Sequence, residues 1–211
     1  MSLPRLPPHA PGMRIGLFGG SFNPPHEGHL LVSRTALTRL RLDRLWWLVS
    51  PCNPLKDPGV LLPLDARMKA AQALLRDPRI IVSDIEAQIG ARYTIDLVRY
   101  LRARYPGVSF VWIMGADSLR NFHQWRRWEE IFSTIPVAII DRPGETVRAT
   151  ASRAAHRFSM ARIDESRSFA LARAAPPAFV YLHGPRSAQS STQLRADRDY
   201  LRSKIGNTQR L

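Results

Sequence analysis

The sequence predicts an α/β fold, a doubly wound parallel sheet with helices on both faces in three layers. Short apolar runs of strand length alternate along the chain with longer segments whose apolar residues repeat at helical spacing. The apolar runs are continuous, which is typical of parallel strands buried on both faces. Because strand–helix–strand connections cross over right-handed, a series of such units covers both sides of one sheet.

The expected elements follow one another in regular order. Strands are expected where apolar residues crowd into short runs, at 13–18, 44–50, 79–86, 108–115, 135–144 and 178–184. Helices are expected where apolar residues recur every three or four positions, at 26–40, 63–77, 93–107, 116–132 (in pieces) and 190–205. Pro63 and Asp65 signal one helix start, and Pro106 with Gly107 stops another.

The length of 211 residues suits one domain, which we assign to residues 13–205. Residues 1–12 are proline-rich and lack the apolar segment of a signal peptide, so we expect a flexible tail there, and another at 206–211. Residues 142–175 are rich in arginine and alanine with little periodicity. We expect them to form a helix and an exposed connection that can be mobile.

The composition narrows the class of protein. No apolar run approaches the roughly 20 residues that span a bilayer, and Cys52, the single cysteine, fits a reducing cytoplasm. The net charge of +14 suits either a nucleic-acid-binding protein or an enzyme for polyanionic small molecules. A solvated basic surface without function also explains it, since arginine is spread through the whole chain.

Polar residues gather in the loops that follow the first four expected strands. The loops read GGSFNPPHEGH, PCNPLKD, SDIE and MGADS. The carboxyl ends of parallel strands lie at one edge of a sheet, and ligands bind there, at the point where the strand order reverses. The sequence therefore predicts a binding site built from these four loops.

The segment GGSFNPPHEGH at 19–29 allows three interpretations. A zinc site is disfavoured, because HEGH spaces its histidines by three rather than four and offers no third ligand. A plain turn explains the glycines and prolines but not two histidines at a helix start. A phosphate cradle explains both, since Gly19 and Gly20 admit a ligand to the backbone. The helix start and its two histidines then supply donors to an anion.

The same segment resembles the GxFxPxHxGH signature of the nucleotidylyltransferase superfamily, and SSTQLR at 190–195 resembles its second signature. The segments SDIEAQIGARYTID, GADSLRNFHQW, PCNPLKD and DARMKAA resemble bacterial nicotinate-nucleotide adenylyltransferases over about residues 13–205. The resemblance implies a Rossmann-like fold and adenylyl transfer from ATP, with Mg²⁺, to nicotinate mononucleotide. The products would be nicotinate adenine dinucleotide and pyrophosphate, in NAD synthesis. The substrate phosphate would attack in line, without a covalent enzyme intermediate.

The resemblance also assigns roles to residues. It implies catalytic roles for His26, His29, Lys56 and Arg195. It implies ATP contacts for Gly19, Gly20, Ser21, Phe22, Gly28, Gly115, Asp117, Ser191 and Thr192, and nicotinate-nucleotide contacts for Tyr93, Thr94 and Trp125. No protein ligand to a metal is expected, because ATP phosphates would hold Mg²⁺. Thr94 or Asp117 as a helix N-cap, and Trp125 as a core residue, remain the alternatives.

Three positions depart from the family pattern. Asn23 stands where the family usually has Asp, Leu55 where His often precedes the lysine, and Gln189 where Ile usually precedes SST. Two other functions stay open at this point: a pantetheine-phosphate adenylyltransferase, and a basic nucleic-acid-binding protein suggested by HQWRRW. We expect neither a membrane nor a specific nucleic acid as partner. The sequence leaves the oligomeric state open, a homo-oligomer included.

Overall fold

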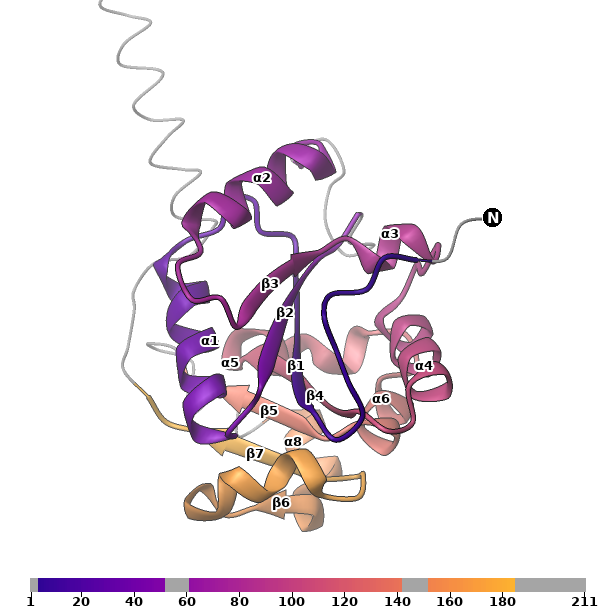
Figure 1. The fold of residues 1–211 in the computed structure, drawn as a ribbon. Coiled ribbons are helices and arrows are strands. Elements are labelled where there is room, and N and C mark those ends of the chain that lie inside the picture. The colour runs from indigo at the N-terminus through magenta and orange to yellow at the C-terminus, as the bar shows by residue number, and fades with distance from the viewer. Residues whose placement is uncertain (1–3, 52–60, 142–151, 185–211) are drawn as a thin grey trace, which may run out of the picture.

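The computed structural model describes residues 4–51, 61–141 and 152–184. Its centre is a seven-stranded sheet in the order β3-β2-β1-β4-β5-β7-β6, with every neighbouring pair parallel (Figure 1). The strands are β1 Arg14–Gly20, β2 Arg44–Val49, β3 Ile80–Ser83, β4 Ser109–Gly115, β5 Val137–Ile140, β6 Arg162–Ile163 and β7 Phe179–Leu182. The chain order reverses between β1 and β4, where the sequence predicts the site.

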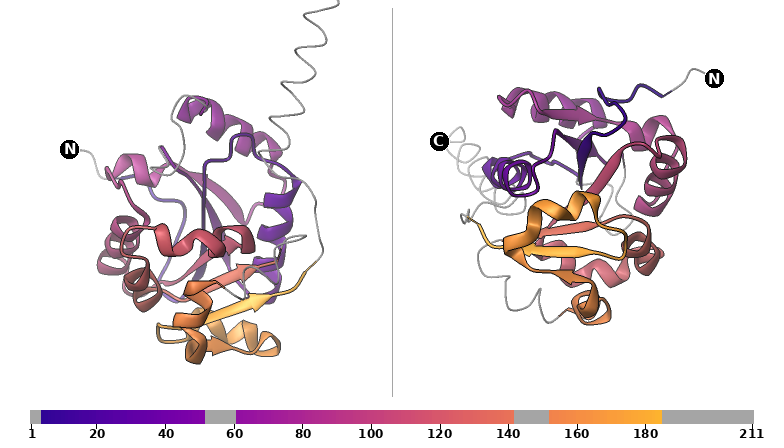
Figure 2. Two further views of the ribbon diagram at one scale, coloured as in Figure 1. Left: turned by 180° about the vertical axis from the view of Figure 1, so that it is seen from behind. Right: turned by 60° about the horizontal axis from the view of Figure 1, so that its bottom comes forward.

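Helices cover both faces of this sheet, as predicted. The α-helices are α1 Glu27–Arg39, α2 Leu64–Leu74, α3 Ile85–Gln88, α4 Thr94–Arg104, α5 Ala116–Asn121, α6 Trp128–Thr134 and α8 Arg153–Arg157. The 3₁₀ helices are η2 Phe122–Gln124, η3 Ser159–Ala161 and η4 Glu165–Arg173. The two further views of Figure 2 show these layers from other sides.

Two hydrophobic cores lie on opposite faces of the sheet. One core packs side chains of α1, α2 and η4 against one set of strand residues. The other packs α3, α4, α5, α6 and α8 against the alternate set. Neighbouring strand residues therefore enter different cores, as Trp46 and Trp47 of β2 do. The doubly wound three-layer fold is confirmed.

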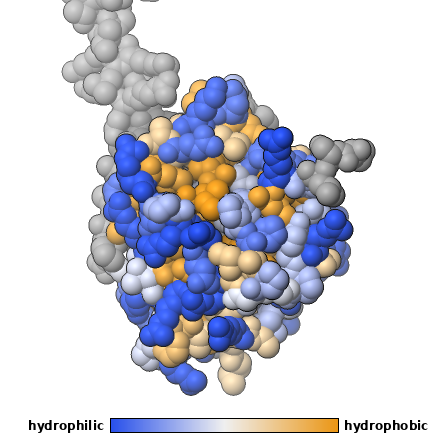
Figure 3. Space-filling view, viewed as in Figure 1, coloured by the Kyte–Doolittle hydropathy of each residue, from blue (hydrophilic) through white to orange (hydrophobic). Residues whose placement is uncertain are grey.

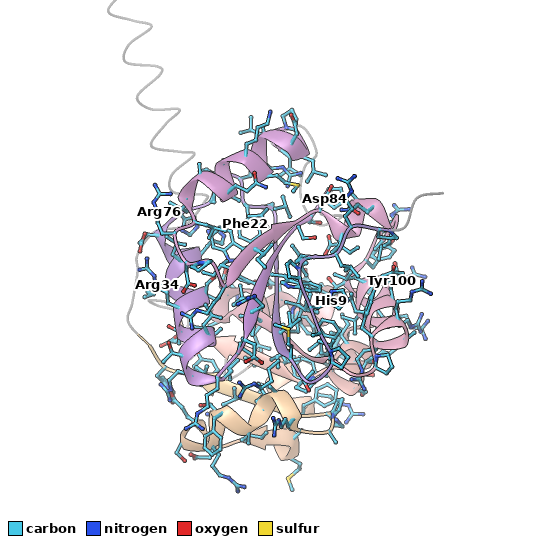
Figure 4. The ribbon with its side chains drawn as sticks, in the orientation of Figure 1. His9, Phe22, Arg34, Arg76, Asp84 and Tyr100 are labelled. Atoms are coloured by element: carbon cyan, nitrogen blue, oxygen red, sulfur yellow. The ribbon has the colours of Figure 1, made fainter. Side chains whose placement is uncertain are left out.

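Residues of the expected loose tail contact the rest of the fold. The Gly12 amide donates to the Gly107 carbonyl at 2.7 Å, and the Arg5 amide donates to Gln88 Oε1 at 2.6 Å. The His9 ring meets Tyr105 edge-on with centroids 4.6 Å apart. Figure 4 labels His9 on the α4 side of the sheet and Phe22 on the α1 side. Residues 4–12 thus have aromatic and backbone partners in the fold, and the flexibility expected of them stays a prediction.

Two further expectations need correction. The strand expected at 79–86 ends at Ser83, because Asp84 turns the chain into α3. The 142–175 connection is described from residue 152, and there it forms α8, η3, the two-residue strand β6 and η4. β6 escapes prediction because a two-residue strand carries no periodic pattern. The 190–205 helix and the 206–211 tail lie outside the described residues.

Candidate active site

A cavity of about 540 Å³ opens at the carboxyl ends of β1 and β4. Residues from β1, α3, α4, α5 and the η2–α6 connection line it. Seven of the predicted site residues are among them: Gly19, Gly20, Ser21, Tyr93, Thr94, Asp117 and Trp125. Predicted ATP contacts and predicted nicotinate-nucleotide contacts thus face one cavity, which we call the reaction pocket.

The other predicted residues lie beside this pocket or outside the description. His26, His29, Phe22 and Gly28 belong to the turn and helix that follow Ser21, and Gly115 ends β4. None of these five lines the reaction pocket. Four predicted residues lie outside the described part of the chain: Lys56, Ser191, Thr192 and Arg195.

The two histidines together cap the start of α1. The Gly28 amide donates to His26 Nδ1 at 3.1 Å, and the His26 amide donates to His29 Nδ1 at 3.2 Å. Their rings lie 3.9 Å apart between centroids, and both residues are buried. Because Nδ1 accepts in both rings, a neutral imidazole carries its proton on Nε2. The helix start therefore fixes both histidines as Nε2–H donors.

Aromatic side chains pack against the ring of His29. Its ring lies 4.8 Å from that of Phe22, which in turn stacks on Trp47 at 4.7 Å. Phe22 has φ +45° and is buried, so a bulky residue takes a backbone conformation that is rare for L side chains. Phe22, which is a predicted ATP contact, thus packs against the ring of His29 and positions it.

Gly19 is required by packing against Trp112. A Cβ at this position would lie 2.7 Å from the Trp112 Cη2 atom and 3.0 Å from Cζ2. The Trp112 ring is buried and lines the reaction pocket, so it cannot move without changing the pocket. The sequence alone does not predict this close packing of an indole on Gly19.

Gly19→Ala is expected to lower the free energy of unfolding by about 1–3 kcal/mol, as overpacking does. The clash with Trp112 is the physical reason. Urea unfolding measures it, and Gly184→Ala is the matched control, because its nearest neighbour would be Thr35 at 3.5 Å. Equal stability of the two variants would contradict the packing role of Gly19.

Arg67 of α2 joins the loops that follow β1 and β2. Its guanidinium donates to the carbonyls of Ser21 at 2.8 Å and Ser50 at 2.7 Å, and to those of Leu62 and Pro51 at 2.8 and 3.3 Å. The side chain is buried, with 2% of its surface exposed. Both loops are part of the binding site predicted from the sequence. Arg67 therefore fixes their spacing, which the sequence did not reveal.

Asn23 is buried and held to the segment before α2. Its side-chain Oδ1 accepts from the Leu62 amide at 3.4 Å. An amide oxygen accepts this bond and, unlike the carboxylate of an aspartate, adds no negative charge near the expected phosphates. Asn23 thus serves as a tie between the motif and the α2 segment, in place of the aspartate usual in the family.

The acceptor side of the pocket comes from α4 and the η2–α6 connection. Tyr93 is the N-cap of α4, and Thr94 is its first helical residue, so the N-cap alternative for Thr94 is wrong. The guanidinium of Arg126 lies 5.0 Å from the centre of the Tyr93 ring, and that of Arg92 lies 5.6 Å away. Both arginines line the pocket. Two positive charges therefore lie near the helix start, where the Asp96 carboxylate accepts from the Tyr93 amide at 3.2 Å.

Trp125 stands between η2 and α6, so it does not share a helix with Trp128. Its ring packs at 4.8 Å from Phe122 while its side chain also lines the reaction pocket. Trp128 meets Phe158 edge-on in the core. This separates the two tryptophans as predicted, one toward the pocket and one toward the core.

Gly115 and Asp117 follow β4. Gly115 is the N-cap of α5, so Asp117 is its second residue and the N-cap alternative for Asp117 is wrong. Asp117 lines the reaction pocket together with Ser118. A carboxylate there accepts hydrogen bonds from hydroxyls, which is the role predicted toward a ribose.

Glu86 of α3 is a pocket residue that the sequence analysis missed. Burial raises the pKa of its carboxyl to about 7, although a hydrogen bond with Ser50 acts in the opposite direction. The segment SDIE placed it near the site, but no pattern in the sequence marks a glutamate as buried.

This raised pKa predicts a pH dependence of stability. In the unfolded chain the carboxyl titrates near 4.5, so the fold favours the protonated form. Stability is unaffected below that pH and falls as pH rises from 4.5 to about 7. Glu86→Gln should remove this loss. Above pH 7 its free energy of unfolding should therefore exceed that of the parent by up to about 3 kcal/mol.

Urea unfolding at pH 5 and pH 8 measures this difference. Glu129→Gln, at an exposed position on α6, is the matched control and should follow the parent at both pH values. Parallel behaviour of Glu86→Gln and the parent would contradict the assignment of a protonated buried carboxyl.

In the ranges that the structure describes, no three His, Cys, Asp or Glu side chains gather closely enough to hold a metal ion. Mg²⁺ held by ATP phosphates stays a prediction. No described helix is long and apolar enough to cross a membrane.

Comparisons with known proteins agree with this geometry. The family model "Cytidylyltransferase-like" matches residues 17–197. A probable nicotinate-nucleotide adenylyltransferase of Methylorubrum extorquens is 63% identical over 87% of this chain and 99% of its own length. One of Mesorhizobium japonicum is 53% identical over 89% of this chain and 97% of its own.

The chain belongs to the nicotinate-nucleotide adenylyltransferase family. A solved structure supports the fold of this family member: Plasmodium falciparum nicotinic acid mononucleotide adenylyltransferase complexed with NaAD. It aligns with a TM-score of 0.62 at 20% identity, over 86% of this chain and 82% of its own. The family membership confirms the resemblance seen in GGSFNPPHEGH, SDIEAQIGARYTID and GADSLRNFHQW.

Proposed function

We propose that this family member transfers the adenylyl group of ATP to nicotinate mononucleotide. A phosphate oxygen of the mononucleotide attacks the α-phosphorus of ATP in line. The bond from that phosphorus to the oxygen bridging toward the β-phosphorus breaks. Nicotinate adenine dinucleotide forms and pyrophosphate leaves, so no enzyme nucleophile is needed.

One observation carries this proposal. The motif residues Gly19, Gly20 and Ser21 and the acceptor residues Thr94 and Trp125 line the same cavity. A site for a single nucleotide would not need both sets. A reaction that joins two nucleotides brings both to one place.

The histidines supply charge stabilisation in this reaction. Their Nε2–H groups are donors, because both Nδ1 atoms accept backbone amides. Donors held in place toward a developing anionic centre lower the barrier without reorganisation at the moment of reaction. Lys56 and Arg195, outside the described residues, are proposed as further phosphate contacts, and Mg²⁺ is proposed to arrive on ATP.

The acceptor side favours an acid over an amide. The N-terminus of α4 at Thr94 directs backbone N–H groups and a positive dipole end toward an anion. Arg92 and Arg126 add two positive charges to the same wall. A nicotinate carboxylate gains from all three, and a nicotinamide does not.

A steady-state assay tests the proposal. Pyrophosphate release should require ATP, Mg²⁺ and an acceptor, and nicotinate mononucleotide should give the higher kcat/KM when compared with nicotinamide mononucleotide and phosphopantetheine. Well-folded protein without turnover on nicotinate mononucleotide would overturn the proposal. Cytoplasmic location stays a prediction.

Trp125→Ala is expected to raise the KM for nicotinate mononucleotide roughly 3- to 10-fold, since aromatic stacking contributes about 0.5–1.5 kcal/mol beyond burial. Trp125→Phe, which keeps a flat ring, should retain most of the affinity. The KM for ATP should stay near the parent value in both. A rise in both KM values would instead indicate general damage to the pocket.

A further inference from the structure

A second concave site lies at the opposite end of the central strand. Arg14, the first residue of β1, lines a cavity of about 730 Å³, whereas Gly19 and Gly20 at the end of β1 line the reaction pocket. The two cavities share no lining residue. At about 3.3 Å per residue, the strand separates them by roughly 20 Å.

Arginines dominate this second cavity, which we call the basic pocket. Besides Arg14, four arginines line it: Arg41 after α1, Arg162 of β6, and Arg167 and Arg173 of η4. They come from segments far apart in the sequence that β1, β6 and η4 bring together. Figure 3 shows hydrophilic and apolar side chains interspersed at this η4 end of the molecule.

Most of this positive charge is not neutralised. Arg14 pairs with Asp43 at 3.0 Å. Asp164 is the acidic residue in the lining, and its carboxylate accepts from the Ser166 amide at 2.9 Å. Across the described ranges, the side chains of the four remaining arginines form no hydrogen bond or salt bridge.

An exposed ring accompanies these charges. Phe169 of η4 lines the basic pocket and keeps 47% of its surface exposed. The Arg41 guanidinium lies 5.0 Å from the centre of this ring, and Arg41 has φ +50°. A non-glycine residue in that conformation is uncommon. The turn thus directs a guanidinium over an aromatic face that faces solvent.

We propose that the basic pocket binds a small anion with several phosphoryl groups, separately from the reaction pocket. Guanidinium groups match phosphate oxygens in pairs of hydrogen bonds and stay charged at all working pH values. Four of them around one carboxylate repel each other until an anion of comparable charge arrives. A concave wall of this size accommodates a nucleotide or a short polyphosphate, and Phe169 offers a flat face for a base.

Calorimetric titration with tripolyphosphate tests the site in the full chain. The variant Arg167→Ala/Arg173→Ala should weaken one class of sites at least 10-fold and keep the parent's adenylyl-transfer activity. The control Arg102→Ala/Arg104→Ala, which removes two exposed charges from α4, should bind like the parent. Unchanged tripolyphosphate binding in the first variant would overturn the proposal.

A second arm identifies the source of the phosphates. Guanosine triphosphate is titrated into His29→Ala, with and without Phe169→Ala. Binding tighter than tripolyphosphate that weakens on removing Phe169 supports a nucleotide, and equal binding of both probes supports a polyphosphate. If the arginine variant changes affinity only for a single-stranded oligonucleotide, the small-anion site is wrong. Because binding is read without turnover, failure of the reaction assay leaves this test intact.

Discussion

His29→Ala is expected to lower kcat at least about 100-fold, the usual cost of removing one transition-state donor. The substitution removes the Nε2–H donor and also the Nδ1 acceptor that receives the His26 amide. The lost cap should lower the free energy of unfolding by only about 1 kcal/mol. Turnover should therefore fall far more than stability does.

His29→Asn separates these two effects. An asparagine at this position retains an acceptor for the helix start, so stability should return toward the parent while kcat stays low. His156→Ala, at an exposed position on α8, is the control and should keep parent values of both. Near-parent turnover of His29→Ala would show that the chemistry does not use this histidine.

Arg67→Met is expected to lower the free energy of unfolding by about 3–5 kcal/mol, because buried carbonyl groups lose a charged donor. Methionine fills much of the volume, so the loss reports hydrogen bonds rather than a cavity. The loops after β1 and β2 would no longer be held at a fixed spacing, so kcat/KM should fall as well. Urea unfolding and the adenylyl-transfer assay measure the two losses.

Lys69→Ala provides the matched comparison, since it removes an exposed cation from the same helix. The urea concentration at the midpoint of its unfolding should stay close to that of the parent. Arg67→Lys should fall between, because an ammonium group cannot reach four carbonyls in the fixed fork geometry of a guanidinium. A parent-like midpoint for Arg67→Met would mean that the loops hold their spacing by other contacts.

Most of the sheet was predictable because burial on both faces leaves long apolar runs. Six of the strands in the structure correspond to such runs, and β6 does not. The contacts of residues 4–12 could not be predicted because their partners, such as Tyr105 and Gly107, lie about a hundred positions away. Local composition describes a proline-rich segment, and only the folded neighbours decide whether it is held.

The residues of the site likewise fall into two groups, those that sequence motifs predict and those that they do not. Gly19, Thr94 and Trp125 could be placed from motifs, and they meet in the reaction pocket. Arg67 and Glu86 could not, because a buried charged residue looks like an exposed one in sequence. What distinguishes them is a set of carbonyls or an apolar enclosure supplied by the tertiary fold.

The two hydrophobic cores hold different parts of the active site in place. The capped histidines stand on α1, which packs in one core, whereas Thr94 and Trp125 are held by elements of the other. The histidines predicted to hold phosphates and the residues predicted to contact the nicotinate nucleotide therefore lie on opposite faces of the sheet. Substitutions in the layer that holds Thr94 and Trp125 are therefore expected to change the acceptor contacts while leaving the packing of α1 and its two histidines intact.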